Sequence, residues 1–141
     1  MTRPLRTAAL LALALAACDE PSLGTSTAWE ADIANLGGST VTGTLNSVSR
    51  GQIIESHLNL SGSTEGAVHP WRIRTGPCAG GGTLVGGRAS YPDGVADEDG
   101  DVVLASTANA VLEPGRTYHV DVLRGVGSDT TLVACGRLDQ V

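Results

Sequence analysis

The feature that most constrains the fold of this chain is a strict alternation of apolar and polar residues. It is clearest at 53–60, where one set of alternate positions is mostly apolar and the other polar: Ile54, Ser56, Leu58 and Leu60 against Glu55, His57 and Asn59. Side chains of a strand point alternately to opposite faces, so this pattern is typical of a strand with one buried face. Such runs recur at spacings of roughly 8–12 residues, and no segment has a sustained helical period. The sequence therefore predicts an all-β domain, either a sandwich or a barrel.

We expect strands separated by glycine-rich turns at residues 28–36, 40–48, 53–60, 67–74, 102–112, 117–123 and 130–138. The central strand places Trp71 and Ile73 on one face and Arg72 and Arg74 on the other. Its apolar face is expected to anchor the core. Its opposite face carries two cations in an otherwise acidic chain and is the first candidate for function.

The first residues indicate export and lipid attachment. Arg3 and Arg6 precede an apolar run at 7–17, which is too short to cross a bilayer because a spanning helix needs about 20 apolar residues. A basic start followed by a short apolar segment and small residues indicates a secretory signal peptide. Residues 15–18 (Leu-Ala-Ala-Cys) resemble the bacterial lipobox, in which the cysteine is acylated and becomes the new N-terminus. The alternative is an ordinary signal peptide with a chance cysteine.

This interpretation divides the chain into a signal peptide at 1–17, a lipidated tether at 18–27 and one β-domain at 28–141. Acyl chains on Cys18 would hold the protein on a membrane, since each buried methylene contributes about 0.8 kcal/mol. We therefore expect a lipid anchor in the bacterial cell envelope, at the periplasmic face or the cell surface. Asp19 resembles an inner-membrane retention signal of enteric bacteria, and the choice between inner and outer membrane stays open.

Charge argues against one class of partner. The chain has 9 basic and 15 acidic residues and no lysine, and removal of Arg3 and Arg6 with the signal peptide makes it still more acidic. Binding to nucleic acid needs a basic surface, so we expect no nucleic-acid partner. Phenylalanine is absent, so the core must be built from aliphatic residues around two tryptophans. A core this light usually needs a covalent or metal staple.

The three cysteines suggest that staple. With Cys18 lipidated, Cys78 and Cys135 remain as an even pair in an oxidising compartment, where such pairs form disulfides. Closing a loop of this length is worth roughly 4 kcal/mol in the chain-entropy model. The alternative is a thiol metal site or a nucleophile, which has less support because neither cysteine lies in a CxxC or HxxC spacing.

Two loops invite functional interpretations that we do not favour. Residues 78–93 contain five glycines, but nothing helical follows them and there is no Gly-Lys-Ser/Thr, which argues against a phosphate-binding loop. Residues 97–101 (Asp-Glu-Asp-Gly-Asp) could offer oxygens to calcium, yet they lack the EF-hand pattern, and Asp-Gly is common turn chemistry. We expect a solvated turn there.

Three stretches occur in a characteristic order. They are residues 69–74 (His-Pro-Trp-Arg-Ile-Arg) with Cys78, residues 95–117 ending in Gly-Arg-Thr, and residues 132–136 (Leu-Val-Ala-Cys-Gly). They resemble the His-Gly-Phe-His-Val-His strand, the Lys-Asp-Gly to Gly-Arg-Thr segment and the terminal Leu-Ala-Cys-Gly of Cu/Zn superoxide dismutases and of the related CHRD-type domains. The resemblance spans residues 28–138. It implies a superoxide-dismutase-like Greek-key β-sandwich or barrel with a Cys78–Cys135 disulfide.

The resemblance does not extend to the metal ligands. The family's paired copper histidines fall at Arg72 and Arg74, which have no lone pair to give a metal, and another falls at about Asp121. The arginine that guides superoxide falls at Leu132, and residues 79–90 contain no histidine for zinc. We therefore expect no metal, no cofactor and no catalytic residue.

The histidines are scattered in the sequence. His69 matches a structural position of the family, and His57 is expected on a solvated strand face. His119 shares a strand face with Asp121 and could reach the arginines, and we expect it in a polar patch at the surface.

We therefore expect a non-catalytic, membrane-anchored envelope lipoprotein with a binding or structural role. Arg72 and Arg74 either grip an anionic ligand or an envelope protein partner, or pair internally with acids such as Asp121 or Glu55 as cross-strand glue. The internal pairing is the favoured interpretation. The alternative function is a divergent periplasmic metal-binding protein or superoxide dismutase that uses His69, His119 and Asp121.

Overall fold

The computed structural model describes residues 24–125 and 131–141, which are built almost entirely from antiparallel strands. The longer strands are β1 (Ser26–Asn35), β2 (Thr42–Arg50), β3 (Ile53–Ser61), β5 (Trp71–Thr75), β7 (Val102–Ala108), β8 (Tyr118–Arg124) and β9 (Thr131–Gln140). They form one seven-stranded sheet in the order β5-β8-β9-β1-β2-β3-β7. Two short strands, β4 (Val68–His69) and β6 (Gly94–Val95), pair with each other, and a 3₁₀ turn, η1 (Arg88–Ser90), lies between β5 and β6.

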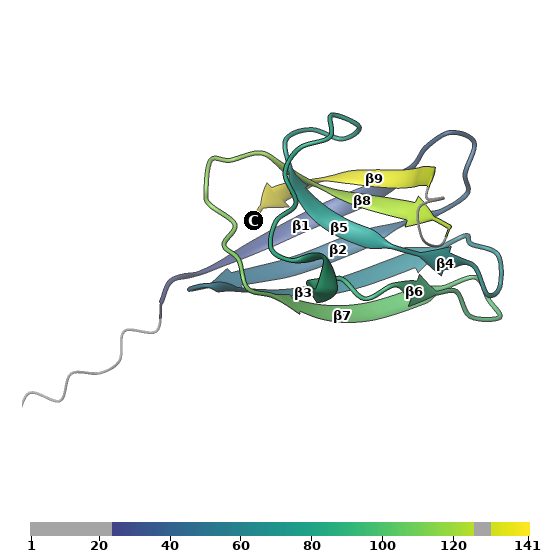
Figure 1. Ribbon diagram of the computed structural model, residues 1–141, viewed down its shortest axis with the longest axis horizontal. Helices are drawn as coiled ribbons and strands as arrows, with labels where there is room; N and C mark the ends of the chain where they lie inside the picture. Colours follow the sequence, from purple (N-terminus) through teal and green to yellow (C-terminus); the bar gives the residue numbers. More distant parts are fainter. Residues whose placement is uncertain (1–23, 126–130) are drawn as a thin grey trace, which may run out of the picture.

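The sheet curls into a half-barrel, so that its edge strands β5 and β7 approach each other (Figure 1). At one end the β4–β6 pair lies between these edges. The amide of Gly125 donates to the carbonyl of Val68 at 3.3 Å, which ties β4 to the end of β8. A side chain at Gly94 would lie 2.5 Å from Val102 Cγ1, so β6 can approach β7 this closely only with glycine. The chain passes from β3 to β5, and from β7 to β8, between strands that are not neighbours, as in Greek-key folds.

The predicted strands are present, with shifted ends. The sheet begins at Ser26, two residues before the expected start, and the strand expected at 102–112 ends at Ala108. The strand expected at 67–74 is divided into β4 and β5 by Pro70, which has no amide hydrogen to give to a neighbouring strand. The carbonyl of Pro70 still accepts a hydrogen bond from the amide of Leu123 at 2.8 Å.

In β3 and β5 the alternation in the sequence correctly predicted which side chains face the core. Trp71 and Ile73 are completely buried, and the apolar set of β3 also faces the interior. The aromatic residues pack edge to face in two pairs: the ring centroids of Trp29 and Tyr118 lie 5.6 Å apart, and those of Trp71 and Tyr91 lie 5.0 Å apart. The core lies between the two curled halves of the sheet, and β5 contributes to it with one face only.

The disulfide between Cys78 and Cys135 is present, as predicted. It joins the loop that follows β5 to the middle of β9. The acidic segment is a turn, as expected: one oxygen of the Asp97 carboxylate accepts hydrogen bonds from the amides of Asp99 and Asp101, at 3.0 and 2.9 Å.

Cys18 and the expected signal peptide lie outside the described residues. Among the residues that are described, no helix is long and apolar enough to span a membrane.

Candidate functional site

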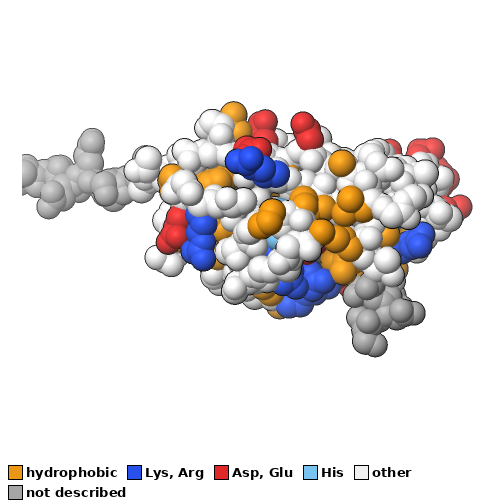
Figure 2. Space-filling model, turned by 90° about the horizontal axis from the view of Figure 1, so that it is seen from above, with side chains coloured by type: hydrophobic (Ala, Val, Ile, Leu, Met, Phe, Trp, Pro, Cys, Tyr) orange, Lys and Arg blue, Asp and Glu red, His pale blue; other side chains and the backbone are white. Residues whose placement is uncertain are grey.

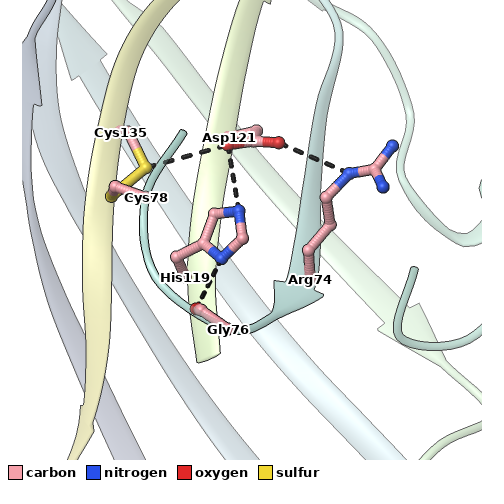
Figure 3. The surroundings of a disulfide bond; sticks show 6 residues. All are labelled: Arg74, Gly76, Cys78, His119, Asp121 and Cys135. Atoms are coloured by element: carbon pink, nitrogen blue, oxygen red, sulfur yellow. Dashed lines mark hydrogen bonds and ion pairs between the residues drawn. A yellow bond between two sulfur atoms is a disulfide. The ribbon is translucent and has the colours of Figure 1, made fainter. Parts of the chain in front are cut away.

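Pairing of β5, β8 and β9 brings the predicted site residues to one outer face of the half-barrel. Arg72 is opposite Asp121 and Arg74 is opposite His119 across the β5–β8 ladder. Asp121 is in turn opposite Cys135 across the β8–β9 ladder. Figure 3 shows Asp121 between Arg74 on one side and His119 and the disulfide on the other. The sequence grouped these residues through periodicity and resemblance, and the strand register places them together.

Asp121 and Arg74 form an internal ion pair. The guanidinium Nε of Arg74 lies 3.4 Å from Asp121 Oδ2, and both side chains are mostly buried. Arg74 also donates from an η nitrogen to the carbonyl oxygen of Gly82 at 2.6 Å. This arginine therefore holds β5, β8 and the loop after β5 together, as the cross-strand interpretation expected for the arginines. Glu55, the other acid considered, forms no ion pair within the described residues.

Arg72 lies differently. It is half-buried, and its Nε is fully buried without a hydrogen-bond partner among the described residues. Burial, followed by the positive charge of Arg74, lowers the pKa of the Arg72 guanidinium. The carboxylate of Asp121 opposes this shift, and Arg88 adds to it. Within the described part of the chain, Arg72 thus forms no ion pair or hydrogen bond of the kind that holds Arg74.

Arg88 was not among the residues predicted for the site. It lies at the start of η1, and its guanidinium contacts the Asp93 carboxylate and donates to the carbonyl oxygen of Tyr91. The sequence offered no signal that would place Arg88 near Arg72, because the loop at 76–87 separates it from the end of β5. Seen from above, basic side chains form separate groups on this face, and most acidic side chains lie toward its periphery (Figure 2).

The prediction of His119 as part of a surface patch is wrong, because its side chain is completely buried. The loop at 76–82, tied down by the disulfide, covers this part of β8. Nδ1 of His119 hydrogen-bonds to the carbonyl oxygen of Gly76 at 2.7 Å. Nε2 lies 3.2 Å from Asp121 Oδ1 without the alignment of a hydrogen bond, so the contact is electrostatic only.

Asp121 also contacts the disulfide. Its Oδ1 lies 3.7 Å from Cys135 Sγ, which carries no hydrogen in the oxidised state, so the contact is one of packing. The oxygens of Asp121 thus face a guanidinium, an imidazole and a sulfur, each from a different direction. This carboxylate is the centre of the site.

The other two histidines lie elsewhere. His57 is exposed on β3, as expected. His69 is buried, with Nδ1 2.9 Å from the carbonyl oxygen of Leu123 and Nε2 2.6 Å from Ser63 Oγ. Because a carbonyl can only accept, Nδ1 carries the hydrogen and Nε2 accepts from the Ser63 hydroxyl. His69 therefore joins the turn after β3 to β8.

The site does not fit the copper centre that the family resemblance would imply. The three positions that the resemblance would align with copper ligands do meet, since Arg72, Arg74 and Asp121 are neighbours on paired strands. Two of them, however, present guanidinium groups, which only donate hydrogen bonds and give no lone pair to a metal. Copper redox sites need several imidazoles around one ion. We therefore assign no copper chemistry to these positions.

A comparison with protein-family models found no match for this chain, and a comparison with curated proteins found none either. The resemblance to superoxide dismutases and CHRD-type domains therefore stays a prediction that depends on the three sequence motifs.

Proposed function

We propose that this protein is a lipid-anchored, non-catalytic β-domain of the bacterial cell envelope that binds an anionic group through Arg72. The anion is a carboxylate or phosphate, either of a small ligand or of an envelope partner. The observation that carries the proposal is the buried Nε of Arg72, which has no partner among the described residues. A buried polar group without a partner lowers the stability of a fold, and a guanidinium matches the geometry of an oxyanion.

The two arginines have separate roles in this proposal. Arg74 is neutralised by Asp121 and held by the Gly82 carbonyl, so it is part of the scaffold. Arg74 is paired with Asp121 and Arg88 with Asp93, so Arg72 is the cation of this group that keeps its charge available for an anion. In an acidic protein this single positive charge attracts an anion locally, and the attraction falls with ionic strength.

Replacement of the two arginines tests this division. We expect Arg72→Ala to change the free energy of unfolding by less than about 0.5 kcal/mol, as for a residue without internal partners. Arg74→Ala is expected to lower it by about 1–2 kcal/mol, because a mostly buried ion pair and a hydrogen bond to Gly82 are lost. Chemical denaturation of both variants measures the two values.

Binding is tested with inorganic phosphate and with succinate as probes. Both should raise the melting temperature of the wild-type protein at low salt, and Arg72→Ala should abolish the increase. Arg116→Ala is the matched control, since Arg116 is exposed and pairs with Glu113 in the segment between β7 and β8. An equal response of the wild type and Arg72→Ala, or a strong loss of stability in Arg72→Ala, would contradict the proposal.

Lipid anchoring is tested separately through Cys18. We expect the wild-type chain to fractionate with membranes and to incorporate radiolabelled palmitate in a bacterial host. Cys18→Ser should lose the label and appear in the soluble periplasmic fraction, because the acyl chains supply the membrane affinity. Membrane association of Cys18→Ser equal to that of the wild type would show that the lipobox interpretation is wrong.

A further inference from the structure

The imidazole of His119 has an unsatisfied nitrogen that the scaffold does not explain. The side chain is fully buried, and its Nδ1 bonds to the carbonyl of Gly76, which can only accept, so Nδ1 carries a hydrogen. The opposite nitrogen, Nε2, has no hydrogen-bond partner among the described residues and faces Asp121 Oδ1 at 3.2 Å. A nitrogen lone pair and a carboxylate oxygen repel each other at this distance. A positive charge between the two atoms removes this repulsion, and a bound metal cation supplies one.

Sulfur completes this arrangement. Nε2 of His119, a carboxylate oxygen of Asp121 and Sγ of Cys135 all lie within 4.8 Å of one another. The sulfur of Cys78 is bonded to the last of these. Two cysteines, one histidine and one aspartate are ligand types that zinc accepts, with bonds of about 2.0–2.3 Å in a tetrahedral site.

Two of the separations between these atoms are close to those of a tetrahedral site. With bonds of about 2.0–2.3 Å, ligand atoms of a tetrahedral zinc site lie roughly 3.3–3.8 Å apart. The observed separations are 3.2 Å between His119 Nε2 and Asp121 Oδ1, and 3.7 Å between Asp121 Oδ1 and Cys135 Sγ. In the oxidised protein the disulfide consumes both thiolates, so only a nitrogen and an oxygen can bind a cation.

The outer contacts also fit a metal site. Histidine ligands of metals usually donate their other ring N–H to a carbonyl or carboxylate, as Nδ1 of His119 does to Gly76. Arg74 holds Oδ2 of Asp121 and leaves Oδ1 directed at the other ligand atoms. Two thiolates, a carboxylate and Zn²⁺ carry one negative charge in sum, which the Arg74 guanidinium neutralises.

We propose that reduction of the Cys78–Cys135 disulfide creates a zinc site formed by Cys78, Cys135, His119 and Asp121. A dithiol supplies two electrons and two protons to the disulfide and is itself oxidised to a cyclic disulfide. Zn²⁺ then replaces the protons of the two thiols, which are released to solvent, and Nε2 and Oδ1 complete the coordination. This site does not use Arg72 and is independent of the proposed anion binding.

The loop that carries Cys78 can accommodate the change. The two sulfurs must separate from about 2.05 Å in a disulfide to roughly 3.8 Å in a tetrahedral zinc site. Residues 79–82 (Ala-Gly-Gly-Gly) follow Cys78 directly, and Ala79 has a φ of 59°, a conformation that is unfavourable for alanine. A glycine-rich segment allows Cys78 to move by this amount while β9 keeps Cys135 in place.

Titration with Co²⁺ and Zn²⁺ tests the proposal. The purified protein is reduced with a phosphine, which does not compete for the metal as a dithiol would, and Co²⁺ is added. We expect one equivalent to bind with a thiolate-to-cobalt charge-transfer band, and Zn²⁺ to displace it. The oxidised protein should show no such band. His119→Ala should lower the Zn²⁺ affinity of the reduced protein by at least about 100-fold, the upper end of what loss of an outer-shell partner costs.

Matched variants keep the test decisive. His57→Ala removes an exposed histidine and should change the Zn²⁺ affinity by less than twofold. Cys78→Ser leaves the Cys135 thiol free without any reductant and should bind Co²⁺ through one thiolate, with a weaker band. A reduced protein without the band, a Zn²⁺ affinity that His119→Ala does not lower, or a reduced protein that is unfolded and does not refold with Zn²⁺ would each overturn the proposal.

Discussion

Replacement of both Cys78 and Cys135 by alanine is expected to lower the free energy of unfolding by about 4 kcal/mol. The disulfide closes a segment with a sequence separation of 57 residues, and the chain-entropy model gives roughly this value for a loop of that size. For a domain of somewhat more than 100 residues, this corresponds to a decrease in melting temperature of about 15 °C. Thermal and chemical denaturation of the double variant and the wild type measure the change.

The double variant is the appropriate comparison because a single replacement leaves a reactive thiol. Reduction of the wild type should produce the same loss of stability in the absence of metal. Addition of Zn²⁺ should restore part of this stability to the reduced wild type but none to the double variant, since binding to the folded state alone stabilises it. A loss of less than about 1 kcal/mol in the double variant would show that the bridge contributes little to the fold.

The disulfide matters for the site as well as for stability. It holds the loop at 76–82 against β9, and this loop supplies two carbonyl groups to the site, Gly76 to His119 and Gly82 to Arg74. A side chain at Gly82, where φ is 86°, would lie 1.8 Å from the carbonyl oxygen of Thr75, so the loop also needs glycine to approach β5. The disulfide and the glycines therefore act together, because both are needed for the loop at 76–82 to cover the outer face of β8.

The sequence predicts the strands well because burial of one face imposes a period of two. Trp71 and Ile73 are buried and Arg72 and Arg74 lie on the other face, as the alternation requires. Pro70 divides the expected strand because it has no amide hydrogen to donate to a neighbouring strand. The alternation of apolar residues reports which faces are buried and does not report which backbone groups can form hydrogen bonds.

The outer face was predicted less well because it depends on a loop. Alternation places His119 away from the core, which for a simple sheet means exposure, whereas here a second layer of chain covers it. The different partners of Arg72 and Arg74 could not be predicted either. Both are opposite a polar residue of β8, and only the positions of the side chains decide that Arg74 reaches Asp121.

The second large effect concerns Trp71, on the inner face of β5. We expect Trp71→Ala to lower the free energy of unfolding by about 3–5 kcal/mol. Trp71 is fully buried, packs edge to face on Tyr91 and donates from Nε1 to the carbonyl oxygen of Pro92 at 3.0 Å. Removal of the indole leaves a large cavity and leaves the Pro92 carbonyl oxygen without its hydrogen-bond donor. The loop at 85–92 also loses its contact with β5 at Tyr91. Chemical denaturation measures the loss, and Trp71→Phe, which keeps a ring, should lose only about 1–2 kcal/mol.

Tyr91 provides a second measurement of the same change. Burial raises the pKa of Tyr91 from its ordinary value of 10.0 to about 12, and its hydroxyl donates to the carbonyl oxygen of Val85 at 2.5 Å. Because the folded state disfavours the phenolate, the stabilisation from this group is complete below pH 10 and is lost as the pH rises toward about 12. In Trp71→Ala, water reaches the ring, so the pKa of Tyr91 should fall toward 10 in a spectrophotometric titration. If the pKa of Tyr91 in Trp71→Ala equals that of the wild type and the loss of stability is small, the burial of Tyr91 does not depend on Trp71.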